Sequence, residues 1–162
     1  MRFCVVGAGA MGCLYGGRLA KAGIDVTLVD PWAEHVAAIN ASGLLLGGLG
    51  GDVRIRVPAT TDPAGLAPAD AVIVLADANS TAAAGKTAAR LVAEDGLVLT
   101  LQNGIGNYEA LVPAIGEART LAGLSYHSAA MAGPGHALHT NAGPTWLGER
   151  DGSRSDRLAR LE

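Results

Sequence analysis

The stretch RFCVVGAGAMG, at residues 2–12, decides the fold. Its first five residues form a short apolar run that is typical of a buried strand. Glycines follow at once, and apolar residues then recur at helical spacing up to Ala22. Gly7 permits a sharp turn, Gly9 leaves room for a pyrophosphate to approach the backbone, and Gly12 lets the helix pack closely on the strand. This strand–turn–helix unit predicts dinucleotide binding, with contacts from Gly7, Ala8, Gly9, Ala10, Met11 and Gly12.

A carboxylate follows the second expected strand, which covers residues 25–29. Asp30 stands eighteen residues after Gly12, where a carboxylate can accept hydrogen bonds from the ribose hydroxyls of the cofactor. The alternative is a strand-end turn formed with Pro31. The cofactor is NAD or NADP, and Asp30 favours NAD because a phosphate on the ribose 2′ oxygen would place two anions side by side.

The rest of the chain alternates strands with helices. This order predicts an α/β fold of the Rossmann type, doubly wound, with a mostly parallel sheet, helices on both faces and an antiparallel extension near the C-terminus. We expect strands at 71–75 and 96–101, helices at 32–40, 80–92 and 108–115, a hairpin from 43–46 and 52–57, a turn-rich connection at 58–68, and an antiparallel meander at 119–146.

Composition excludes several classes of function. The 162 residues carry a net charge of −3 without a basic stripe, which argues against nucleic-acid binding. No apolar run reaches the roughly 18 residues that a membrane span needs. Cys4 and Cys13 have no metal-binding spacing, so we expect buried, reduced thiols in a cytoplasmic protein. The four histidines likewise show no metal pattern with nearby acids; they are His35, His127, His136 and His139.

A second polar cluster, QNGIGN at residues 102–107, follows the strand at 96–101. Amide side chains there would stand at the carboxyl ends of the parallel strands, where open α/β sheets bind ligands. Because Asn-Gly is also an ordinary turn pair, the residues alone leave a ligand contact and a plain turn equally open for Asn103.

The order GAGAMG, QNGIGN and YHSA is similar to the amino-terminal domain of the ketopantoate reductase (2-dehydropantoate 2-reductase) family over residues 1–150. Members reduce a 2-keto acid with a nicotinamide cofactor on the pantothenate pathway. The resemblance implies that residues 7–12 hold the pyrophosphate, that Asn103 lies near the nicotinamide ribose and the substrate, and that Ala129 contacts the cofactor through its backbone.

The chain departs from the family pattern in three places. Asp77 stands where the family typically has a lysine, and Asp30 where it has a basic or neutral residue. The family's catalytic lysine lies in a carboxyl-terminal helical domain, before which this chain ends. We therefore expect residues 151–162 to begin a linker helix towards that domain, with Leu158 and Leu161 left uncovered, and we assign no catalytic residue within this chain.

Alternative functions stay open at this point. One is a stand-alone NAD-sensing regulatory module, and another is a related dehydrogenase that acts on a different 2-keto acid. For the reductase, the expected partners are the dinucleotide and a small 2-keto acid bound together with the second domain, and the composition leaves homo-oligomerisation open. We expect the 162 residues alone to be inactive, because hydride transfer needs a general acid and exclusion of water.

Overall fold

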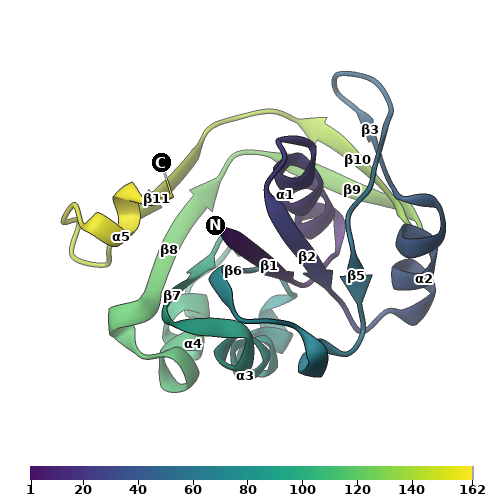
Figure 1. The fold of residues 1–162 in the computed structure, drawn as a ribbon. Coiled ribbons are helices and arrows are strands. Elements are labelled where there is room, and N and C mark those ends of the chain that lie inside the picture. The colour runs from purple at the N-terminus through teal and green to yellow at the C-terminus, as the bar shows by residue number, and fades with distance from the viewer. Residues whose placement is uncertain (162) are drawn as a thin grey trace.

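The computed structural model describes residues 1–161 and has two β-sheets with helices packed on them (Figure 1). The strands are β1 (Arg2–Val6), β2 (Asp25–Val29), β3 (Leu44–Gly48), β4 (Val53–Ile55), β5 (Ala59–Thr60), β6 (Ala69–Val74), β7 (Val92–Thr100), β8 (Thr120–Ser125), β9 (Ser128–Gly133), β10 (His136–Asn141) and β11 (Thr145–Gly148). The helices are α1 (Ala10–Lys21), α2 (Ala33–Ser42), α3 (Thr81–Leu91), α4 (Asn107–Ile115) and α5 (Asp156–Ala159), with short 3-10 turns at Pro63–Gly65, Ala78–Ser80 and Glu117–Arg119.

The main sheet has seven strands in the order β11-β8-β7-β6-β1-β2-β5. Six of them are parallel, and β11 pairs antiparallel with β8 at the edge. This is the strand order of the dinucleotide-binding α/β fold, in which the chain reverses direction across the sheet on either side of β1. The prediction of a Rossmann-type, mostly parallel sheet with an antiparallel extension is confirmed.

The two faces of the main sheet are covered differently. Helices α3 and α4 pack on one face, below the sheet in Figure 1. On the other face α1 packs against β1 and β2, and its outer side is covered by a second sheet of order β4-β3-β10-β9. Glycines make α1 thin enough for this double packing: a Cβ at Gly16 would lie 2.3 Å from Leu28 Cδ2, and one at Gly17 would lie 3.0 Å from Leu44 Cδ2.

The prediction of one antiparallel meander over residues 119–146 is wrong. Strand β8 joins the main sheet beside β7, whereas β9 and β10 form a hairpin in the second sheet. The hairpin enters that sheet because β10 pairs in parallel with β3, which lies about 90 residues earlier in the chain. The expected hairpin of β3 with β4 is confirmed, and the turn-rich stretch at 58–68 contains a short strand, β5, that pairs with β2.

The C-terminal segment also differs from the expectation. The side chain of Leu158 is buried and that of Leu161 packs against the main core, so neither is left without a surface to cover. Within this segment α5 is only four residues long, with the Ser155 hydroxyl accepting from Leu158 N as its cap. Cys4 and Cys13 are both buried and free, as predicted.

Candidate functional site

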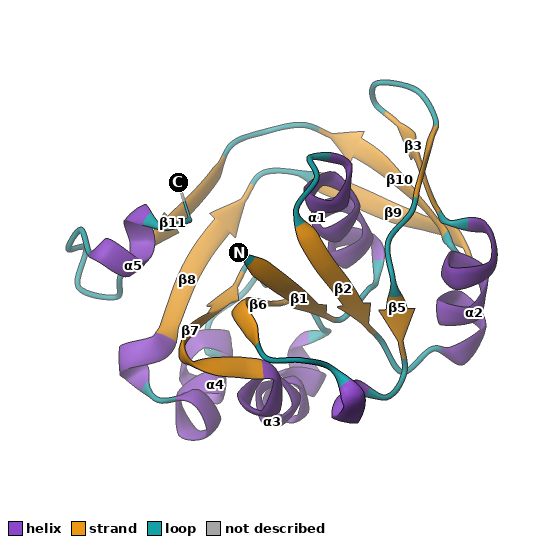
Figure 2. Ribbon diagram, in the orientation of Figure 1, coloured by secondary structure: helices purple, strands orange, loops and turns teal. Residues whose placement is uncertain are grey.

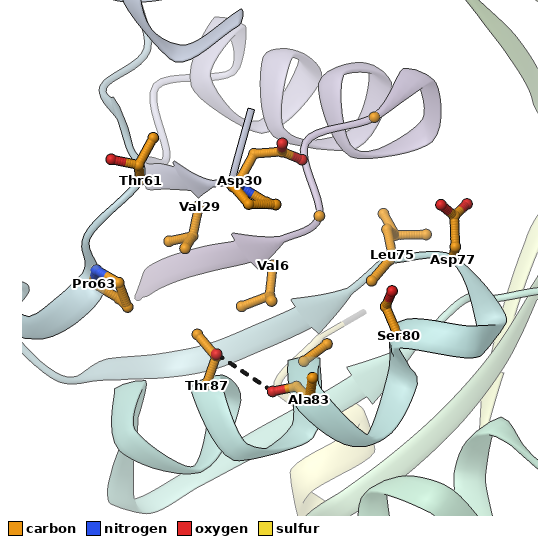
Figure 3. A pocket seen from close by; sticks show the side chains of 15 residues that line it. Val6, Val29, Asp30, Thr61, Pro63, Leu75, Asp77, Ser80, Ala83 and Thr87 are labelled. Carbon is orange, nitrogen blue, oxygen red and sulfur yellow. Dashed lines mark hydrogen bonds between the residues drawn. The ribbon is translucent and has the colours of Figure 1, made fainter. Parts of the chain in front are cut away.

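A pocket of about 440 Å³ opens at the carboxyl ends of β1, β2 and β6, where the strand order reverses. Val6, Val29 and Leu75 form its apolar floor. Figure 3 shows Thr61 and Pro63 at one end of this pocket and Asp77 and Ser80 at the other. The carboxyl edge at a strand reversal is where open α/β sheets bind ligands, so the fold places the pocket where a dinucleotide is expected.

The three glycines of the loop differ in their backbone conformation and in the room that the protein leaves for a Cβ. Gly7 has φ +93°, and a Cβ there would lie 2.5 Å from Ala76 N. A Cβ at Gly12 would lie 1.9 Å from the carbonyl oxygen of Gly7. Gly9 has φ −62°, and a Cβ there would meet nothing within 4 Å. The fold therefore requires Gly7 and Gly12, whereas the missing side chain of Gly9 leaves open space above the start of α1.

This open space fits a pyrophosphate. Gly9 lines the pocket and precedes the first turn of α1, whose first N–H groups have no partner within a helix. Their partial positive charge favours an anion at that point. Of the predicted phosphate contacts, Gly7 and Gly9 line this pocket, Met11 lines a neighbouring cavity, and Ala8 and Gly12 are buried beneath the loop.

Asp30 lines the same pocket and is half-buried. Its Oδ2 accepts a hydrogen bond from Ala8 N at 2.7 Å, and its Oδ1 accepts one from Trp32 N at 2.9 Å. The second bond is the strand-end turn that the sequence left as the alternative. The first ties the carboxylate to the glycine loop, and each oxygen keeps a lone pair that can accept from a ligand hydroxyl.

The side-chain amides of Gln102 and Asn103, in the loop after β7, have different surroundings. Gln102 Nε2 donates to Ala76 O at 2.6 Å and to Thr81 Oγ1 at 2.8 Å, and Thr81 Oγ1 donates to Asn107 Oδ1 at 2.9 Å. These bonds hold the loop against β6 and α3. The side chain of Asn103 has no hydrogen bond to any residue in 1–161 and is exposed. Turn chemistry thus accounts for its neighbours, and Asn103 is left available to a ligand.

Asn103 lies in a second cavity of about 380 Å³, which adjoins the first. Both cavities are lined by Leu75, Ala76 and Asp77, so they adjoin along the edge of the sheet, and the two together are called the groove. Met11 and Ala129 also line the second cavity. The structure therefore brings Asn103 and Ala129 together, although β9, which carries Ala129, belongs to the other sheet.

The charge of the groove is negative. Asp30 and Asp77 are its charged side chains, and no lysine or arginine of the described chain lines either cavity. Arg54, on β4, donates instead to the carbonyl oxygens of Ser42 and Gly43. An anionic group that enters the groove would thus meet no lysine or arginine among the described residues, and its donors would be backbone N–H groups and neutral polar side chains such as that of Asn103.

A buried network supports the glycine loop from behind. The Cys13 thiol donates to the Ala8 carbonyl at 3.0 Å, and His35 Nε2 lies 3.4 Å from the sulfur. Gly135 N, in the turn between β9 and β10, donates to His35 Nδ1 at 2.9 Å. Burial, with a smaller contribution from the Asp30 charge, raises the pKa of Cys13 to about 12, so the sulfur stays protonated.

Sequence reasoning missed His127 as a residue of the site, because nothing in the local pattern shows that β9 approaches the loop after β7. His127 and Ser125 line the second cavity beside Asn103. Among residues 1–161 no group of three or more potential metal ligands gathers, and no helix is both long and apolar enough to cross a membrane.

The chain is similar to proteins of known fold and name. The sequence model of the family described as ketopantoate reductase PanE/ApbA matches residues 3–152. The 2-dehydropantoate 2-reductase of Halobacterium salinarum is 36% identical over 160 residues, which cover 98% of this chain and 52% of that protein. The crystal structure of 2-dehydropantoate 2-reductase from Geobacter metallireducens GS-15 has a TM-score of 0.91 and 32% identity, covering 99% of this chain and 53% of that one.

A further solved structure is the ternary structure of D-mandelate dehydrogenase with NADH and anilino(oxo)acetate. It has a TM-score of 0.88 and 27% identity, and covers 99% of this chain and 51% of that one. The chain thus spans about half the length of the curated relatives it matches.

Proposed function

Because the chain belongs to the ketopantoate reductase family, we propose that it is the dinucleotide-binding part of an oxidoreductase that reduces a 2-keto acid, 2-dehydropantoate, with NADH or NADPH. The observation that carries this proposal is the pair of adjoining cavities, one with the open space over Gly9 and the other lined by Asn103 and Ala129. The first cavity lies at the carboxyl ends of β1, β2 and β6, which are neighbouring strands of the main sheet (Figure 2).

Each part of the groove has a task in this proposal. The start of α1 and the open space at Gly9 hold the pyrophosphate, and the Asp30 carboxylate accepts from the adenosine ribose. Asn103 and the backbone of Ala129 orient the nicotinamide ring in the second cavity. The bound nicotinamide supplies the hydride, and the residues of this chain position it, because orientation of the reactants is a major part of such catalysis.

The first test is binding without turnover. We expect the 162-residue chain to bind NADH in a calorimetric titration, and to oxidise NADH with 2-dehydropantoate no faster than buffer does. The physical reason is that the groove is open to solvent and its lining holds no lysine that could protonate the keto oxygen. A chain that binds neither dinucleotide would refute the proposal, and turnover by this chain would show that its catalytic group lies within residues 1–162.

Asp30 favours NADH over NADPH in this proposal. A ribose hydroxyl bonded to the carboxylate contributes about 1.5–3 kcal/mol. Two anions about 4 Å apart at an effective dielectric constant near 20 repel by on the order of 4 kcal/mol. Asp30→Asn removes the charge and keeps an oxygen that can accept from Ala8 N, so it should narrow the affinity ratio of NADH to NADPH at least tenfold. Tighter NADPH binding by the wild type would contradict this assignment.

A related dehydrogenase with another 2-keto acid as substrate is the second candidate, and it is raised by Asp77, which stands where the family pattern has a lysine. Asp77 is exposed and lines both cavities, so it repels a substrate carboxylate that lies nearby. We expect Asp77→Asn to strengthen binding of the anion oxamate to the NADH-loaded chain, as measured by calorimetry. Unchanged oxamate affinity would mean that Asp77 does not face the substrate.

A further inference from the structure

A line of three basic side chains runs from the surface of α1 to the second cavity. Arg18 Nη2 lies 3.2 Å from Nδ1 of His139, which is 2% exposed. An arginine side chain only donates hydrogen bonds. His139 Nδ1 therefore accepts, and the imidazole is neutral with its proton on Nε2. Burial, and then the charges of Arg18 and His127, lower the pKa of His139, which agrees with a neutral ring.

The same reasoning fixes the next ring. His139 Nε2 lies 3.1 Å from His127 Nδ1. Because His139 carries its proton on Nε2, it donates, and His127 Nδ1 accepts. His127 is then also neutral with its proton on Nε2. The donors thus point in one direction, from Arg18 through His139 to His127.

The backbone and an aromatic ring hold His127 in this position. His127 N donates to Ser125 Oγ at 3.1 Å, and Tyr15 packs edge-on against the imidazole with ring centroids 6.1 Å apart. Tyr15 in turn donates to Ser125 Oγ at 2.7 Å. The ring is therefore oriented by contacts from α1, β8 and β10.

The Nε2 of His127 has no partner in the described chain. No hydrogen bond joins it to residues 1–161, and among their buried side-chain atoms only His136 Nε2 lacks a partner. The Nε2 of His127 is thus accessible, on a residue that lines the cavity of Asn103 and Ala129. We propose that His127 is a binding residue of this cavity. Its Nε2–H group donates a hydrogen bond to an acceptor oxygen of the ligand, and His139 and Arg18 are positioning residues that set its tautomer.

The acceptor is a carbonyl oxygen, either in the nicotinamide carboxamide or in the 2-keto acid. A neutral donor suits both, because it binds an uncharged oxygen without adding a charge to the groove. This inference rests on the proposed function for the identity of the ligand, but the tautomer of His127 follows from Arg18 and His139 alone.

The tautomer is tested first, by ¹⁵N–¹H NMR of the histidine rings in the 162-residue chain at pH 8. We expect both His127 and His139 to show the Nε2–H form. Arg18→Met removes the donor and should release the His139 tautomer, whereas Arg18→Lys keeps a donor and should preserve it. Arg18 is exposed on α1, so neither variant should disturb folding. A Nδ1–H form of His127 in the wild type would overturn the inference by itself.

Binding is tested with three probes: ADP-ribose, NADH, and oxamate added to the NADH-loaded chain. His127→Phe keeps a ring of similar shape, and His127→Gln returns an N–H near the position of Nε2. We expect His127→Phe to bind ADP-ribose normally and to lose about tenfold in affinity for one other probe, with His127→Gln recovering most of it.

The probe that is affected identifies the acceptor. A loss already seen with NADH assigns the carboxamide oxygen, and a loss seen only with oxamate assigns the keto acid. Normal binding of all probes by His127→Phe, or an equal loss with ADP-ribose, would refute the role of His127 while leaving the proposed function intact. A wild-type chain that binds none of the probes would refute the proposed function, and the ligand assignment with it.

Discussion

Two alanine substitutions in the glycine loop should separate folding from binding. At Gly12 a Cβ would lie 1.9 Å from a backbone oxygen of Gly7, whereas at Gly9 it would meet no atom of the protein within 4 Å. Gly12→Ala should therefore destabilise the fold, and Gly9→Ala should leave the fold intact and obstruct the ligand. The two substituted positions are three residues apart, and each variant gains one methyl group.

The loss of stability in Gly12→Ala follows from what the methyl group strikes. A carbonyl oxygen cannot move aside by changing rotamer, so α1 must shift away from the β1–α1 loop. Overpacking of this kind costs about 3 kcal/mol. For a chain of this length that corresponds to a decrease in the melting temperature of roughly 6–12 °C.

Gly9→Ala has two small and opposite effects on stability. Alanine is a poorer N-cap than glycine by a few tenths to about 1 kcal/mol. It also restricts the unfolded chain, which stabilises by about 0.4–1 kcal/mol when the native φ suits alanine, and the φ of −62° does. The melting temperature should thus change by less than about 3 °C. Affinity for NADH should fall at least tenfold, or about 1.4 kcal/mol, because the methyl group occupies the space over α1.

The assay pairs differential scanning calorimetry with titration of NADH into each variant. Normal NADH affinity in Gly9→Ala would refute the placement of the pyrophosphate over Gly9. A melting temperature of Gly12→Ala within about 2 °C of the wild type, well below the expected decrease, would show that the close contact with Gly7 does not constrain the loop.

Three further outcomes follow from buried groups. Burial raises the pKa of Cys4 to about 11 and that of Cys13 to about 12. Neither thiol should therefore react with Ellman's reagent at pH 8 until urea unfolds the chain, and rapid labelling of the folded chain would contradict this. Burial also lowers the pKa of His139 from its ordinary 6.5, so the unfolded chain takes up a proton below pH 6.5 and the free energy of unfolding should fall there. A His139→Gln chain with the same pH dependence would exclude His139 as the cause. Thr81→Val removes the hydroxyl that donates to the buried Asn107 Oδ1 and accepts from Gln102 Nε2, and it should cost about 1–3 kcal/mol in urea unfolding. Thr81→Ser keeps the hydroxyl and should cost less; equal losses in both variants would rule out the hydrogen bonds as the reason.

Local chemistry makes much of this protein predictable from its residues alone. The turn after β1 needs glycine at positions 7 and 12 whatever surrounds it, and the alternation of apolar strands with helices predicts a parallel sheet. Asp30 and Asn103 follow expected strands, and the ends of parallel strands share one edge of a sheet. Their neighbourhood could thus be predicted from spacing. The roles of these two residues towards the cofactor remain predictions.

Tertiary structure alone decided which distant segments meet. The 119–146 region reads as one meander because its strands are consecutive, yet β8 and β9 part into different sheets. The parallel edge of β3 and the outer side of α1 both need covering, and the β9–β10 hairpin is the segment that covers them. That choice brings Ala129 to Asn103 and lines up Arg18, His139 and His127.

The sequence by itself determined the strand–loop–helix unit, the strand-end positions of Asp30 and Asn103, and the buried, free state of the two cysteines. Each of these depends on φ, on periodicity or on a few neighbouring residues. The tautomer of His127, the tie between Asp30 and Ala8, and the burial of Leu158 were decided only by the fold. The first two depend on hydrogen bonds between residues 22 and 121 positions apart, and such partners are selected by which apolar surfaces and unpaired strand edges remain to be covered.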